Sequence, residues 1–106
     1  MAWMVLICAG LLEIVWAFSM KSSEGFSKLI PTLVTLIVVI LSFFMLSYAM
    51  KTLPLGTAYT VWAGIGVVGS FIVGIVFLGE SASPIRFIAA VLILSGLVLM
   101  KVGTDA

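Results

Sequence analysis

Residues 29–50 read LIPTLVTLIVVILSFFMLSYAM, a stretch without a charged side chain. As an α-helix, a segment of this length rises roughly 33 Å, which matches a bilayer hydrocarbon core of about 30 Å. Three more apolar runs lie at about residues 3–20, 55–78 and 85–100, separated by short polar segments. Lipid-exposed backbone must form helices or a closed barrel, and four barrel strands would use under half of the chain. The sequence therefore predicts an all-α membrane protein with a single domain of four transmembrane helices.

The composition excludes several classes of protein. Of the 106 residues, 64% are apolar and 8% are charged, whereas soluble domains carry about 25% charged residues. A net charge of +1 offers no basic surface for nucleic acid, and a single cysteine forms no disulfide within the chain. The chain has no histidine and no pair of nucleophile and base. We therefore expect the lipid bilayer as solvent, no enzyme activity, and neither a cofactor nor a metal.

The basic residues divide almost evenly between the two sides of the membrane. With four spans, Lys51 and Lys101 lie on the side of both termini, and Lys21, Lys28 and Arg86 lie on the other. Orientation follows the imbalance of Lys and Arg in short loops, so this chain selects an orientation only weakly. We predict insertion in both orientations, which allows an antiparallel homodimer of dual topology. A single topology with a weak bias is the alternative.

Glu13 is the one acidic or basic residue in the interior of a predicted span, since Arg86 lies at the edge of the fourth. It lies about 15 Å beyond Trp3 along a helix, near the membrane midplane, where an acidic side chain costs about 2.5–3.5 kcal/mol. Because no Lys, Arg or His occupies the interior of a span, its countercharge must be a proton or a cation from water. A site that binds either one, but not both, is the minimum for exchange. The alternative is a protonated Glu13 that hydrogen-bonds a neighbouring helix.

The surroundings of Glu13 favour the functional interpretation. Small residues, among them Gly10, share its helical face and leave space, while Trp16 forms a wall. In the second span, Thr35 and Ser42 lie seven residues apart on one face. Taken by themselves, both hydroxyls are expected to bond their own i−4 carbonyls.

Polar, aromatic and small residues follow one face of the third span. A buried tyrosine hydroxyl or indole N–H needs a hydrogen-bond partner, and small residues let another helix approach closely. We therefore expect this face to lie near Glu13, although simple packing is the alternative. Its members are Tyr59, Trp62, Ala63, Gly66, Ser70 and Gly74.

Glycines and alanines suggest where the helices bend and pair. Gly64, Gly66 and Gly69 formally fit a dinucleotide-binding motif, but that motif requires a strand before it and a helix that starts in water. We interpret Gly64 and Gly66 as a hinge in a long helix. Ala89 and Gly96, seven residues apart in the fourth span, predict a dimer contact. Ser83 before Pro84 predicts the start of that span.

Two stretches of the chain resemble the small multidrug resistance family of proton-coupled exporters. They are GLLEIVWA at residues 10–17 and KTLPLGTAYTVWAGIG at residues 51–66, with Gly79-Glu-Ser after them. A tryptophan three residues after the glutamate, as at Trp16, resembles the guanidinium exporter subtype of this family. Quaternary ammonium exporters usually carry a small residue at that position. The resemblance implies an antiparallel homodimer in the inner membrane that exchanges guanidinium for protons. It also implies that Glu13 binds the cation or proton, within a pocket of Trp16, Ser42, Tyr59 and Trp62.

Two positions depart from the subtype: Thr60, where it usually has Ala, and Ala63, where it usually has Thr. They flank Trp62 and bear on the breadth of substrates. The nearest alternative is a quaternary ammonium exporter with the same machinery. A small membrane subunit without transport activity is another, and one half of a heteromeric exporter is a third.

Overall fold

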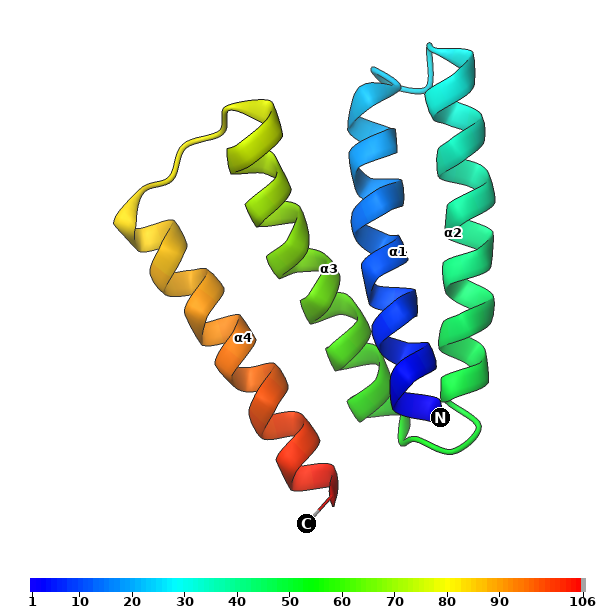
Figure 1. Cartoon of the computed structure of the whole chain (residues 1–106), viewed down its shortest axis with the longest axis vertical. Coiled ribbons are helices and arrows are strands. Elements are labelled where there is room, and N and C mark those ends of the chain that lie inside the picture. Colours follow the sequence, from blue (N-terminus) through cyan, green and yellow to red (C-terminus); the bar gives the residue numbers. More distant parts are fainter. Residues whose placement is uncertain (106) are drawn as a thin grey trace.

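The computed structural model describes residues 1–105, with side chains as far as residue 103, and contains four α-helices (Figure 1). They are α1 (Ala2–Ser22), α2 (Leu29–Ala49), α3 (Leu55–Leu78) and α4 (Pro84–Asp105). Each is long and apolar enough to cross a membrane. The prediction of an all-helical chain with four transmembrane helices is therefore confirmed.

The helix ends follow local sequence signals. α3 stops at Gly79, which adopts a left-handed conformation with φ of 68°. α4 begins at Pro84, and the hydroxyl of Ser83 accepts a hydrogen bond from the Arg86 amide at 3.4 Å. α4 continues five residues beyond the predicted end at residue 100. The prediction placed the end of the helix where the apolar residues end, but the helix extends into the polar residues that follow. Lys101, in this extension, lies over the ring of Trp3, 4.9 Å from its centroid.

The helices form an open layer in the order α2, α1, α3, α4 (Figure 1). The N-terminus, the last turn of α4 and the α2–α3 connection lie at one end, called here the terminal end. The α1–α2 and α3–α4 connections lie at the other, called here the loop end. α1 packs against both α2 and α3, while α4 packs against α3 and none of its residues up to Gly103 is buried.

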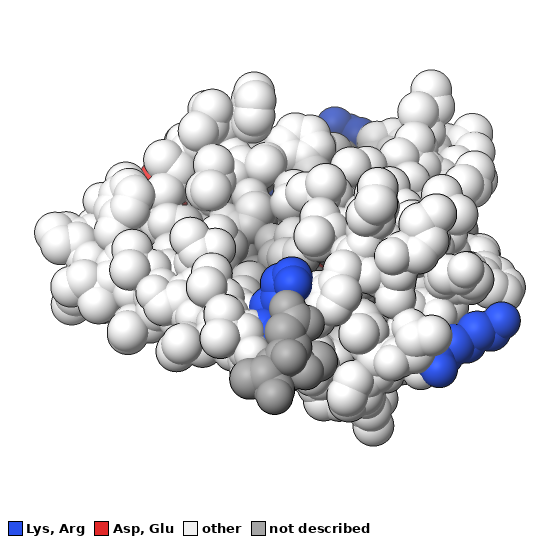
Figure 2. Space-filling view, turned by 60° about the horizontal axis from the view of Figure 1, so that its bottom comes forward, with Lys and Arg blue, Asp and Glu red and all other residues white. Residues whose placement is uncertain are grey.

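The buried apolar core is confined to the terminal half of the bundle. Most other large apolar side chains are exposed, and charged groups are sparse on the face in Figure 2. Such a surface suits a protein whose solvent is lipid, because apolar side chains there need no cover. The core consists of Leu6, Ala9, Leu46, Ala49, Ala58, Val61 and Trp62.

Candidate functional site

Glu13 lies midway along α1 at the contact with α3. Its side chain is only 8% exposed, and it fits against Gly66 so closely that a Cβ atom there would overlap the carboxyl group. Among the described residues, its Oε1 atom has no hydrogen-bond partner. A buried polar atom without a partner costs about 1–3 kcal/mol. The carboxyl group is therefore held in place with an acceptor available for an external donor.

Other glycines at this level also serve close helix contacts. A Cβ atom on Gly10 would meet Ile65 of α3 at 2.8 Å, and one on Gly69 would overlap Ile14 of α1. Gly64 faces the other way, where a Cβ atom would overlap Leu97 of α4. α3 is helical throughout this segment. The glycines predicted as a hinge thus lie where α3 touches its neighbours, and hinge motion stays a prediction.

A chain of hydrogen bonds joins three helices on the terminal side of Glu13. The indole N–H of Trp62 donates to the hydroxyl of Ser42 at 3.0 Å, and that hydroxyl donates to the Ala9 carbonyl at 2.9 Å. In an α-helix, the carbonyl of residue 9 also accepts the amide of residue 13. The chain therefore anchors α2 and α3 to the turn that precedes Glu13.

Only one of the two hydroxyls expected to bond within their own helix does so. Thr35 donates to its i−4 carbonyl, that of Pro31, at 2.8 Å. The same expectation for Ser42 is wrong, because Ser42 faces α1 and finds a carbonyl there. The two residues share a helical face, so their spacing could not distinguish them. Ser42 differs from Thr35 because the Ala9 carbonyl of α1 and the Trp62 indole N–H lie within hydrogen-bond distance of its hydroxyl.

The aromatic residues predicted for the site differ in their surroundings. Trp16 is half-buried, and its buried Nε1 has no partner among the described residues. Tyr59 is 55% exposed, with its ring tilted against Trp62 at a centroid separation of 5.6 Å. Phe43, which the sequence analysis missed, packs edge-on against Trp62, also at 5.6 Å. Its position directly after Ser42 was the available signal.

The remaining predicted residues lie at varying distances from Glu13 along the fold. Ala63 packs against the buried core, Thr60 is exposed, and Ser70 lines a pocket on the loop side. The nearest side chain to Gly74 is that of Glu80, in the α3–α4 connection, which the sequence analysis did not select. Ala89 and Gly96 are exposed on α4.

The chemistry of the site suits a proton or a cation. Within the described part of the chain, no three His, Cys, Asp or Glu residues are grouped to hold a metal ion. The site instead combines one buried carboxyl group, a serine and indole pair, and aromatic rings. A carboxylate pairs bidentately with a planar group of N–H donors, and aromatic faces attract flat cations.

Comparison with known proteins identifies the family. The small multidrug resistance protein family matches residues 1–93. The chain belongs to this family. Members similar to it include the guanidinium exporter of Yersinia pseudotuberculosis serotype I (strain IP32953), 54% identical over 104 residues that cover 98% of this chain and 100% of the relative. The guanidinium exporter of Citrobacter freundii is 53% identical over 104 residues, covering 98% of this chain and 99% of the relative.

Membership of the small multidrug resistance family has two direct consequences. It places the chain in a transporter family and not among enzymes. Together with the four apolar helices, it also makes the chain a multi-pass membrane protein of the inner membrane, as bacterial members of this family are.

Proposed function

We propose that this protein exports guanidinium in exchange for protons, with Glu13 as the shared binding group. The observation that carries the proposal is the buried Glu13 carboxyl group, which lies in the middle of a membrane span and has one oxygen without a hydrogen-bond partner among the described residues. The relatives named as guanidinium exporters cover nearly the whole chain and support guanidinium as the substrate. Trp62, Ser42, Tyr59 and Trp16 would surround the cation.

The coupling follows from mutual exclusion at one carboxylate. Guanidinium that binds from the cytoplasm requires a deprotonated Glu13, so binding releases a proton. The helices then rock around the site, with Gly64 and Gly66 as the hinge, and protons from outside displace the cation. Guanidinium supplies N–H donors that a quaternary ammonium ion lacks, so it can reach the unpartnered Oε1 and offset part of its desolvation.

The transporting unit in this proposal is an antiparallel homodimer of dual topology. The exposed face of α4, with Ala89 and Gly96, supports a dimer contact because no described residue of this helix is buried within one chain. The small side chains at these positions would allow a second helix to approach closely.

Proton release on addition of guanidinium to the detergent-solubilised protein tests the proposal. We expect release at pH values where Glu13 is protonated before binding, and a decline in release as rising pH removes that proton in advance. Apparent affinity should fall as pH falls, because protons compete for the carboxylate. Glu13→Gln should abolish proton release and guanidinium-driven proton movement in liposomes. Normal exchange by Glu13→Gln would disprove the proposal.

A further inference from the structure

A pocket of about 460 Å³ opens at the loop end, between α1, α3 and the α3–α4 connection. Lys21, Glu80 and Arg86 line its charged outer part. Ile14 and Val67, the chain neighbours of Glu13 and Gly66, line the part nearest the membrane midplane. The pocket therefore extends from the loop end to the helix turns that hold Glu13.

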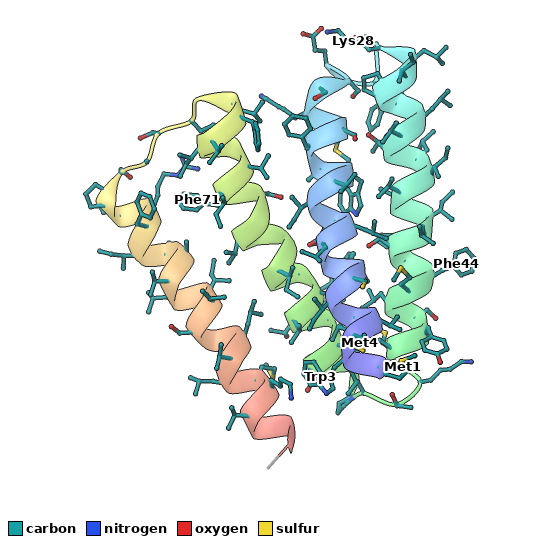
Figure 3. All side chains as sticks on the ribbon, in the orientation of Figure 1. Met1, Trp3, Met4, Lys28, Phe44 and Phe71 are labelled. Atoms are coloured by element: carbon teal, nitrogen blue, oxygen red, sulfur yellow. The ribbon has the colours of Figure 1, made fainter. Side chains whose placement is uncertain are left out.

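The side chain of Arg86 shows how this pocket holds a guanidinium group. Its Nη2 atom lies 3.6 Å from Oε1 of Glu80, and its Nη1 donates to the carbonyl of Ser81. Its Cζ atom lies 5.0 Å from the centroid of the Phe71 ring, which projects from α3 near the first turn of α4 (Figure 3). A carboxylate, a carbonyl and an aromatic face are the groups that recognise a flat cation with N–H donors.

The position of Glu80 is set by the end of α3. The left-handed conformation of Gly79 turns the chain back, and the Glu80 amide donates to the Gly74 carbonyl at 3.0 Å. The Glu80 carboxyl group then lies against Gly74, where a Cβ atom would overlap it. The carboxylate is therefore placed by backbone geometry, and it can keep its position when Arg86 moves away.

We propose that Glu80, Phe71 and the Ser81 carbonyl form an outer guanidinium-binding site, occupied by Arg86 at rest and reached by free guanidinium through displacement of Arg86. This inference rests on the proposed function, because it assigns the same substrate to a second site. The outer site would hold the cation near the loop end before it moves to Glu13.

Two features make this outer site weak, as a transfer site should be. Arg86 is tethered close to Glu80 and competes at an effective concentration on the order of millimolar. Lys21 also lines the pocket, and its positive charge opposes a second cation. Weak binding lets an ion enter and also leave toward the next site. We therefore expect half-occupancy by free guanidinium in the millimolar range or above.

Binding experiments in a Glu13→Gln background isolate the outer site. Guanidinium chloride is titrated into labelled protein while the NMR shifts of the Gly74 and Glu80 amides are followed, with sodium chloride at equal ionic strength as the control. Adding Arg86→Gln should strengthen binding by about tenfold, because the tethered competitor is gone. Adding Glu80→Gln as well should remove saturable binding. Saturable shifts that persist without Glu80, or that sodium chloride reproduces, would overturn the outer site.

Transport by the otherwise unaltered chain provides a second test, with a matched control. Glu80→Gln should raise the half-saturating guanidinium concentration about threefold and leave the maximal rate unchanged. Glu24→Gln removes another loop-end carboxylate, one that pairs with Lys28 at 3.6 Å and does not line the pocket. It should change neither value. Equal shifts in both variants, or none in Glu80→Gln, would contradict the inference.

The two proposals fail in different ways. If the unaltered protein releases no proton and binds no guanidinium, the proposed function itself is wrong. If guanidinium binding that depends on Glu13 is intact while Glu80 has no effect on titration or transport, the outer site alone is wrong.

Discussion

The terminal and loop halves of the bundle are built differently on the two sides of Glu13. On the terminal side, seven buried apolar residues and the Trp62–Ser42–Ala9 hydrogen bonds hold α1, α2 and α3 together. On the loop side, α1 and α3 diverge (Figure 1) and border the 460 Å³ pocket. Phe18 and Phe77 meet there edge to face, with ring centroids 6.4 Å apart.

Under the proposed function, this difference would allow one carboxyl group to be buried and still exchange ligands. The terminal half holds the helix turns around Glu13 by packing and hydrogen bonds, and the loop half contains a pocket that would admit water and a cation. Alternating access would then require the loop half to pack closely while the terminal half opens. The glycine contacts between α1 and α3 would stay in place during this change. Substitutions at the boundary of the two halves and within each half test this division.

Gly66→Ala should disrupt the point where the two halves meet. The added methyl group overlaps the Glu13 carboxyl group, and a displacement of about 1 Å can cost roughly a hundredfold in a positioned site. We expect a loss of that order in guanidinium affinity, measured by proton release. Gly56→Ala, in the same helix with open space around it, is the control and should bind normally. Normal binding by Gly66→Ala would show that the close contact is dispensable.

Ser42→Ala should weaken the frame of the terminal half. It leaves the buried Trp62 indole N–H without its acceptor, which costs about 1–3 kcal/mol. Reversible unfolding in mixed detergent micelles measures the change in unfolding free energy. Ser47→Ala, an exposed serine on the same helix, should stay within about 0.5 kcal/mol of the unaltered protein. Equal losses of unfolding free energy in the two variants would show that the Trp62–Ser42 hydrogen bond does not stabilise the terminal half.

Trp16→Gly should change substrate preference on the loop side of Glu13. Removing this half-buried ring opens space one turn beyond the carboxyl group. In competition between guanidinium and tetramethylammonium, we expect a shift of about tenfold toward the quaternary ion. Trp3→Leu, at the terminal end, should leave the preference unchanged. An unaltered preference in Trp16→Gly would contradict the role of Trp16 as a wall of the site.

Phe18→Leu should have the smallest effect, because it alters the loosely packed half. The ring is 38% exposed and loses one edge-to-face contact, worth about 0.5–1.5 kcal/mol. Phe44→Leu, whose ring points away from the bundle in Figure 3 and is 72% exposed, is the control. Unfolding measurements should place Phe18→Leu between Phe44→Leu and Ser42→Ala. A loss as large as that of Ser42→Ala would contradict the contrast between the halves.

Much of the fold was predictable because lipid imposes simple rules on the chain. Four apolar runs give four helices, since no other element satisfies the backbone of a single span. The same logic selects Glu13, because a lone acid at the midplane is costly. By contrast, the roles of Ser42 and Gly74 were not readable from spacing. A hydroxyl in a helix can bond locally or across, and a glycine can face a helix, a loop or a carboxyl group.

The order of apolar and charged residues along the chain is enough to predict four membrane-spanning helices with one isolated acid in the interior. The physical reason is that hydrocarbon selects helix length and penalises charge without regard to the neighbouring helix. The atoms that meet that acid follow instead from the packing of the helices. Gly66 against the carboxyl group, Ser42 between Trp62 and Ala9, and Glu80 beside Arg86 all depend on how the helices and their connections approach one another. Those approaches arise from close packing, which no periodicity along a single helix specifies.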